Sequence, residues 1–535
     1  MPKFALIIFA LLSTLIVHGE ELFDKYHDNK ELDSFISGLN SPLLKKSILA
    51  KTESGNSIHL LKLSNSQTPR PALLILGDTK ASSAVGTEIL IEWISSLLKN
   101  EDKLKNLIAK NDIYIIPRPF PDSLQTFFGK VKYETDLNST SVDDDGDLEV
   151  NEDGLEDLNE DGFITLLRIA DDEGEFIESK DSPYLMVKSK DKNAKKFQVI
   201  SEGIDNDKDE LFNEDPAGGV NPNRNFAFMY PYFSKDAGTH QLSETETYAL
   251  ADFIFKHPEI NLVFSFGDED NLSKPWKEDK NKARNPIRST IYKDDEQLYQ
   301  TYSDKFKATL KNEEVRNGVQ NPAGRFAHWI YYHFGRISLT TIPWQIPIKD
   351  IPGELSAEAK EIEWLKKNRP QSLVEWKQIK HPDFEDKQVE IGGVKPFYRF
   401  IPNHEECAVL AEKYSIFFEE LIKVQPAIEV KDFKQEKLNN SLTRITLKIK
   451  NTGNAPLSCT SGRKSDKMYP LNVKLKIPEK WQVYNGSPRV QVNNLQIDET
   501  KELSWLILTN DGDQKITVDF SCPQINDFTF KAGDK

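Results

Sequence analysis

Three short acidic segments in the middle of the chain carry oxygen-bearing side chains at alternate positions, each followed by an apolar residue. The nine residues are Asp143, Asp145, Asp147, Asp157, Asn159, Asp161, Asp205, Asp207 and Asp209. This spacing is typical of EF-hand-type loops, which wrap side-chain oxygens around one hard cation. Because so many carboxylates would repel one another without a counter-ion, the pattern predicts calcium at one or two of these loops.

The three loops also depart from the EF-hand pattern. Leu148 and Glu210 stand where glycine is usual, and no loop has a bidentate glutamate at its twelfth position. The alternative reading is a set of solvated acidic loops without metal.

Length and charge limit the function further. The 535 residues, 38% of them hydrophobic, can bury a large core and form two or three domains. The formal net charge is −16, whereas a nucleic-acid partner requires a basic surface that neutralises phosphates. We therefore expect no nucleic-acid partner.

The N-terminus predicts export. Lys3 precedes an apolar run from Phe4 to Val17, and the run ends before Gly19. A run of this length is typical of a signal peptide over residues 1–19 and is too short to span a bilayer, although an uncleaved anchor is the alternative. We expect a secreted or periplasmic protein with no stable membrane span in its mature form.

The chain contains three cysteines, Cys407, Cys459 and Cys522. The last two lie in the C-terminal region and are candidates for a disulfide in an exported protein. Three buried thiols are the alternative.

Residues 20–425 predict an α/β domain, interrupted by acidic inserts at 143–175 and 205–215. Apolar runs bounded by turn residues predict strands at 72–76, 112–117, 260–266 and 337–342, a hairpin over 47–63, and helices at 86–99, 243–257, 327–334 and 405–423. A strand, a helix and a second strand in succession form a β-α-β unit, which predicts a mixed central sheet flanked by helices. Ser243 and Glu246 have the spacing of a capping box.

Residues 426–535 differ from the preceding region. Alternating polar and apolar residues form at least six short strands separated by turns, without a helical pattern. This composition predicts an all-β sandwich similar to immunoglobulin-like modules.

Five segments of the α/β region together resemble the zinc carboxypeptidase family, the carboxypeptidase A-type metallopeptidases. They are "LILGDTKASSAVGTEIL", "IIPRPFPDS", "GGVNPNRNF", "SETETYALADF" and "AGRFAHWIYYHFGRISLTT". The resemblance runs from about Ile48 to about Lys423. It is greatest to members with similar acidic inserts and a similar C-terminal β-sandwich.

The resemblance implies a zinc site made by a His and a Glu three residues apart and by a second His, with a glutamate as general base. In this chain the zinc-ligand positions hold Lys80, Ser83 and Gly267, with Phe266 as an alternative for the last. Ile342 stands at the general-base position, and Gln320 stands at the position of a substrate-binding tyrosine. An ammonium group and a hydroxyl cannot replace zinc ligands, so hydrolysis by the family mechanism is not expected.

Asn223 and Arg224 match the pair with which the family grips the terminal carboxylate of a peptide. The alternative is an arginine that ties neighbouring carboxylates or carbonyls together. We also expect Lys80 to replace the lost cation by pairing with a carboxylate that follows the next strand. The candidates are Asp268, Glu269 and Asp270.

The sequence therefore favours a pseudopeptidase that binds calcium and a peptide or protein C-terminus. One alternative is an active zinc-dependent carboxypeptidase with relocated ligands drawn from His328, His333 and His404, with Glu88 or Glu246. The other is a calcium-dependent structural or adhesion scaffold. A cleft filled by Phe226, Phe228 or Trp344 would favour the scaffold, and an open cleft at Arg224 would favour a binding protein.

Overall fold

The computed structural model describes residues 22–23, 25–143, 148–191, 193–208, 210–213, 215–311, 318–349, 351–509 and 516–532. The predicted signal peptide at 1–19 lies outside these residues. So do three of the predicted calcium ligands, Asp145, Asp147 and Asp209. Within the described ranges, no helix is long and apolar enough to cross a membrane.

A six-stranded mixed sheet forms the centre of the α/β region, as the sequence predicts. Its order is β1-β2-β4-β3-β9-β10, with bounds Leu44–Lys51, Ser57–Leu63, Asp112–Ile116, Ala72–Asp78, Ile260–Phe266 and Ile337–Thr341. β3 runs parallel to β4 and β9, and β10 runs parallel to β9. The C-terminal ends of β3, β9 and β10 therefore meet at one edge of the sheet.

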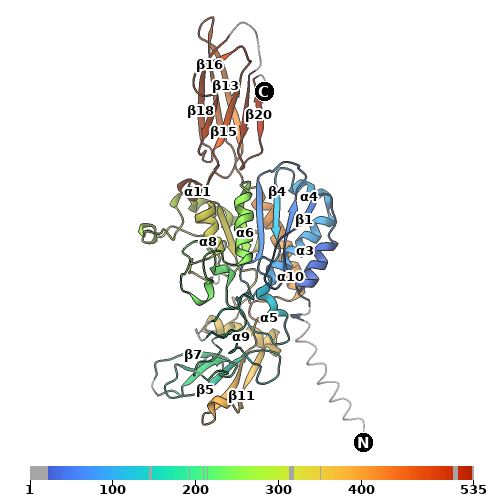
Figure 1. The fold of residues 1–535 in the computed structure, drawn as a ribbon, viewed down its shortest axis with the longest axis vertical. Helices are drawn as coiled ribbons and strands as arrows, with labels where there is room; N and C mark the ends of the chain where they lie inside the picture. Colours follow the sequence, from blue (N-terminus) through green and yellow to red (C-terminus); the bar gives the residue numbers. More distant parts are fainter. Residues whose placement is uncertain are drawn as a thin grey trace.

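Helices cover both faces of this sheet because its central strands are apolar on both sides. Leu73 and Ile75 of β3 pack into the core that contains α3 (Val85–Lys99), α7 (Glu296–Leu310) and α10 (His404–Ile422). Leu74 and Leu76 point the other way, into the core that contains α6 (Thr245–Lys256) and α8 (Phe326–Trp329). Figure 1 shows α3 and α10 on one side and α6 and α8 on the other.

The structure also contains a second six-stranded sheet, which the sequence did not predict. Its order is β11-β12-β5-β8-β6-β7, with bounds Leu373–Ile379, Val389–Val394, Leu166–Ala170, Phe197–Ser201, Phe176–Glu178 and Met186–Lys188. It lies at the opposite end of the molecule from the β-sandwich (Figure 1). The acidic loop at 157–162 enters β5, and the loop at 205–210 follows β8, so this sheet carries two of the three loops.

The C-terminal region forms the predicted β-sandwich. Its sheets have the orders β13-β14-β18-β16 and β17-β15-β19-β20. The strands are Ile428–Lys437, Leu442–Asn451, Leu471–Lys476, Gln482–Asn485, Arg489–Val492, Thr500–Leu508, Thr517–Ser521 and Phe528–Lys531. Cys407, Cys459 and Cys522 are buried thiols, so the Cys459–Cys522 disulfide does not form in this structure.

The expectation of no helix in the sandwich is wrong, because α11 (Thr460–Lys464) interrupts it. The amide groups of Thr460 and Ser461 donate hydrogen bonds to the Asp295 carboxylate, at 2.7 and 3.2 Å. Tyr331 donates to the same carboxylate at 2.7 Å. The buried Asp295 side chain thus holds the start of α11 against the α/β region.

The predicted capping box at α6 is also wrong. The N-cap is Glu244, and no side chain caps the helix through a hydrogen bond. Ser243 lies one residue before this N-cap, and its hydroxyl donates to the Glu244 carboxylate at 2.6 Å and accepts from the Asn225 side-chain amide at 2.9 Å. Glu246 is only 2% exposed, and burial, with the nearby Asp122 and Glu244 charges, raises its pKa to about 7.

The raised pKa of Glu246 predicts a pH-dependent stability. The folded state holds this proton more tightly than the unfolded chain, so the free energy of unfolding falls as the pH rises from 4.5 to about 7. We expect Glu246→Gln to gain stability relative to the unaltered protein by about 2 kcal/mol more at pH 8 than at pH 4.5. Denaturant unfolding at the two pH values measures this difference, with the exposed Glu412→Gln as control. A pH-independent effect of Glu246→Gln would contradict the assignment.

Candidate functional site

Backbone contacts bring the predicted zinc-site positions to one edge of the central sheet. Thr79, just after β3, donates its amide and its hydroxyl to the carbonyl of Phe266, at 2.7 and 2.9 Å. The amide of Gly267, just after β9, donates to the carbonyl of Thr341 at 3.0 Å. The turn that carries Lys80 is therefore adjacent to Gly267 and to the residue after Thr341, which is Ile342.

Gly267 has little room for a side chain. A Cβ atom built on it would lie 2.5 Å from Thr79 Oγ1 and 3.3 Å from Thr340 Oγ1. The position that would carry a zinc-binding histidine is therefore closed by neighbouring threonines, and any larger residue would displace them.

Lys80 forms an ion pair at this edge. Its Nζ lies 3.4 Å from Asp136 Oδ1 and donates to Ser82 Oγ at 2.7 Å. Burial would lower the pKa of Lys80, but Asp136, Glu134 and Asp268 outweigh it and raise the pKa above its ordinary value. Lys80 therefore stays a cation.

The pKa of Asp136 shifts in the opposite direction from that of Lys80. Burial would raise the pKa of this carboxyl, but Lys80 and the hydrogen bonds from Ser82 hold it below its ordinary value. The side chains of Lys80 and Asp136 are 26% and 29% exposed, so the pair is mostly shielded from water. An ammonium and a carboxylate thus neutralise each other at the edge where the family pattern places zinc.

The predicted partners of Lys80 are wrong because other groups engage them. Asp268 accepts from Arg325 at 2.6 Å and acts on Lys80 only at longer range. Glu269 pairs with His328 Nε2 at 3.0 Å. Asp270 accepts from the hydroxyl and amide of Ser273 and from the amide of Leu272.

Ser83 turns away from Lys80. Its hydroxyl donates to Asp78 Oδ1 at 2.8 Å, and the amide of Thr87 donates to the other oxygen of the same carboxylate at 3.0 Å. Burial raises the pKa of Asp78 to about 6 despite these hydrogen bonds. Ser83 and Asp78 therefore fasten the start of α3 to the end of β3.

These residues do not fit zinc. Across the part of the chain that the structure describes, no three His, Cys, Asp or Glu side chains gather in a way that could hold a metal ion. His328 pairs with Glu269, burial and then Lys467 lower the pKa of His333, and His404 begins α10. The three candidates for relocated zinc ligands do not meet at one site.

Asn223 and Arg224 lie in the 3₁₀ turn Pro222–Arg224, close to the same edge. The Asn223 side-chain oxygen accepts from the amide of Phe326 at 3.0 Å. Arg224 Nε lies 3.1 Å from Asp236 Oδ2, and its Nη2 donates to Ser234 Oγ at 3.0 Å. The guanidinium that could grip a peptide carboxylate is thus engaged by a carboxylate of the same chain.

The aromatic residues proposed to fill the cleft lie in two different hydrophobic cores. Phe226 and Phe228 are buried in the core beneath α6 and α8, where Phe226 packs against Phe326. Trp344 belongs to the opposite core. The three side chains therefore belong to the two cores that flank the central sheet.

The three acidic loops share two features at their first and sixth residues, which the structure describes. In each loop the amide of the sixth residue donates to the first aspartate, and the sixth residue has a positive φ. The bonds are Leu148 to Asp143 (3.0 Å), Gly162 to Asp157 (2.7 Å) and Glu210 to Asp205 (3.1 Å), with φ of 83°, 82° and 75°. Leu148 and Glu210 therefore adopt the left-handed conformation that glycine normally supplies. The predicted ligands Asn159 and Asp161 also turn inward and accept amide bonds, and Asp161 lies 3.3 Å from Lys395 Nζ.

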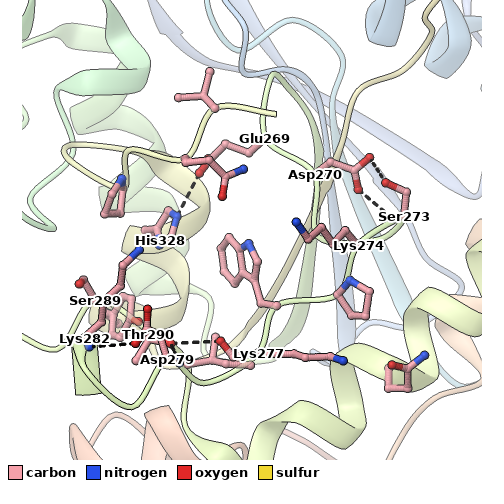
Figure 2. Close-up of a pocket in the computed structure, with 18 of the residues that line it drawn as sticks. Glu269, Asp270, Ser273, Lys274, Lys277, Asp279, Lys282, Ser289, Thr290 and His328 are labelled. Carbon is pink, nitrogen blue, oxygen red and sulfur yellow. Dashed lines mark hydrogen bonds and ion pairs between the residues drawn. The ribbon is translucent and has the colours of Figure 1, made fainter. Parts of the chain in front are cut away.

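A cavity of about 500 Å³ adjoins the sheet edge (Figure 2). Glu269, Asp270 and Gln320 line it on the side of the edge, and residues 273–291 form much of its wall. Gln320 is exposed and donates to the carbonyl of Gly318. The sequence reasoning missed this cavity, although the run "SKPWKEDKNK" combines lysines with a tryptophan.

Two family models match parts of the chain. The zinc carboxypeptidase model matches residues 34–131, which include Lys80 and Ser83. The predicted resemblance is therefore confirmed over this segment. A domain of unknown function (DUF8731) matches residues 427–531, the β-sandwich. No curated protein sequence matches the chain.

Solved carboxypeptidase structures are similar to the chain in outline. Bovine thrombin-activatable fibrinolysis inhibitor, in complex with tick carboxypeptidase inhibitor, is 13% identical over 75% of this chain and 97% of its own, with a TM-score of 0.40. Carboxypeptidase A from Helicoverpa armigera is 13% identical over 75% and 74%, with a TM-score of 0.39. A metallo-carboxypeptidase from Burkholderia cenocepacia is 11% identical over 74% and 69%, with a TM-score of 0.35. No residue role is transferred from these structures.

The Lys80–Asp136 pair predicts a measurable coupling. In a double-mutant cycle with Lys80→Ala and Asp136→Ala, we expect a coupling free energy of about 1 kcal/mol at neutral pH because the pair is mostly buried. The coupling is lost as the pH falls through the lowered pKa of Asp136, and as it rises through the raised pKa of Lys80.

The matched control is the exposed Lys105–Glu101 pair on α4 (Glu101–Leu107), whose side chains are 53% and 59% exposed. Its coupling should be clearly smaller than that of the Lys80–Asp136 pair, because water screens an exposed helical pair. Equal coupling in the two pairs, measured by urea unfolding, would show that Lys80 contributes no more than a surface charge.

Proposed function

We propose that this protein is a non-catalytic member of the carboxypeptidase-like folds that binds a ligand instead of hydrolysing peptides. The Lys80–Asp136 ion pair carries the proposal, because it places a cation and its counter-charge where the family chemistry needs an open zinc site. Ile342 at the general-base position supports it, since an alkyl side chain cannot accept a proton from water.

Binding is favoured over a purely structural role by the open cavity beside the sheet edge. A peptide or protein C-terminus would have to displace Asp236 from Arg224 before the guanidinium could receive its carboxylate. We therefore place the principal ligand contacts in the cavity and regard Arg224 as a secondary contact. Secretion or periplasmic export is part of the proposal and rests on the apolar N-terminal run.

The absence of zinc-dependent hydrolysis is the direct test. The purified protein, dialysed against micromolar zinc, is expected to retain no stoichiometric zinc by elemental analysis. It should also release no C-terminal residue from N-acylated dipeptides ending in Phe or Arg. An active zinc carboxypeptidase assayed in parallel serves as the positive control. One equivalent of zinc together with chelator-sensitive hydrolysis would overturn the proposal and favour relocated ligands.

We further propose that calcium binds at the acidic loops. The loop geometry repeats three times, and two loops keep a positive φ at Leu148 and Glu210, where a non-glycine residue is strained. A bound cation would offset that strain and the mutual repulsion of the carboxylates. An exported protein meets calcium at a concentration that suits weak loop sites.

Calcium binding predicts stabilisation. With an affinity in the extracellular range, 1 mM calcium should stabilise the folded protein by about 1 kcal/mol relative to EGTA, and 1 mM magnesium should not. Asp157→Asn should remove most of the shift in melting temperature if its loop is occupied. The exposed neighbour Asp172→Asn should leave the shift intact. An identical melting temperature in calcium and EGTA would contradict the calcium proposal.

A further inference from the structure

The cavity beside the sheet edge is lined by several positively charged side chains, which is unusual for an acidic chain. Four lysines line it, although the whole protein has a net charge of −16. They are Lys274, Lys277, Lys282 and Lys307. Among the described residues, none of the four lies within ion-pair distance of a carboxylate.

The carboxylates of the same cavity are already engaged. Glu269 is 4% exposed and pairs with His328, and Asp270 accepts three hydrogen bonds from Leu272 and Ser273. Asp279 accepts the amide hydrogen bonds of the turn that begins with it. Figure 2 shows Lys274 on the side of Asp270. The four lysines outnumber the three carboxylates that line the cavity, and one of these carboxylates is paired with His328.

Aromatic rings give the cavity a rigid wall. Trp276 stacks on the His328 ring with centroids 4.5 Å apart and an interplanar angle of 27°. Tyr332, which also lines the cavity, stacks on Phe228 at 4.1 Å and 10°. A planar or apolar ring of a ligand can pack against Trp276 while its charged groups reach the lysines.

Among the described residues that line the cavity, four are lysines and none is an arginine. Lysine offers a compact point charge with rotatable donors, whereas planar carboxylates are matched best by the arginine fork. Tetrahedral oxyanions, such as sulfate or phosphate groups, need no fork and suit separate ammonium groups. Several lysines around one cavity suit more than one such group.

We propose that this cavity binds a ring-containing ligand that carries at least two sulfate or phosphate groups. The inference deepens the binding role proposed above and rests on it. Lys274 and Lys282 contact the oxyanion groups, and Trp276 contacts the ring. The two natural sources of this chemistry are a sulfated sugar and a bisphosphorylated nucleoside.

Calorimetric titration of the full chain tests the proposal. The probes are a trisulfated disaccharide, adenosine 3′,5′-bisphosphate and inorganic pyrophosphate, which has no ring. We expect saturable binding of at least one ring-containing probe, weakened at least tenfold by Lys274→Glu and by Lys282→Glu. Trp276→Leu should weaken binding of that probe while leaving pyrophosphate unchanged. The stronger ring-containing probe identifies the source.

Lys280→Glu is the matched control, because Lys280 is exposed in the same loop but does not line the cavity. It should change affinity by less than threefold. An equal loss in Lys280→Glu and Lys274→Glu, or no saturable binding of any ring-containing probe at millimolar concentration, would overturn the inference. Zinc-dependent hydrolysis would instead overturn the proposed function, and it would leave these titrations unaffected. Circular dichroism verifies that each variant is folded.

Discussion

The Lys80–Asp136 ion pair at the C-terminal edge of the parallel strands constrains what this fold can do. The C-terminal ends of parallel strands lie at the same edge of a sheet. Open α/β sheets commonly carry their functional groups at that edge. Here the edge is closed by an internal ion pair and by the packing of Thr79 against Gly267. In the account proposed here, an ion pair stands at the positions that the resemblance assigns to zinc ligands, and a ligand binds in the neighbouring cavity.

The rest of the site follows from how charges pair around that edge. Arg325 forms an ion pair with Asp268, and His328 forms one with Glu269, so both of these carboxylates after β9 have a partner. Arg224 is tied to Asp236 in the same way. Among the described residues, Lys274, Lys277 and Lys282 of the loop after β9 have no ion-pair partner, so they place positive charge beside these paired groups. Two of the acidic loops flank strands of the second sheet, and in both the amide of the sixth residue donates to the first aspartate.

Much of the central sheet could be predicted from the sequence because its strands are continuous apolar runs, such as 72–76 and 260–266, bounded by breakers. The second sheet could not, because strands such as Phe176–Glu178 have three residues and no clear alternation. The end of β3 was predicted as the site, but the partner of Lys80 was not. Asp136 lies 56 residues away in sequence, in a segment without a periodic pattern, so only the folded chain shows the contact. Similarly, the capping box is wrong because the helix begins one residue later than expected, with Glu244 as its N-cap.

The most direct test of the central claim is anomalous scattering at the zinc absorption edge from crystals soaked in zinc. An ion pair in place of the metal predicts no anomalous peak between Lys80, Ser83 and Gly267, and electron density that joins the Lys80 ammonium to the Asp136 carboxylate. A peak at full occupancy at that edge, with Lys80 displaced from Asp136, would contradict it, because the residues that we regard as closing the site would then be shown to make room for zinc.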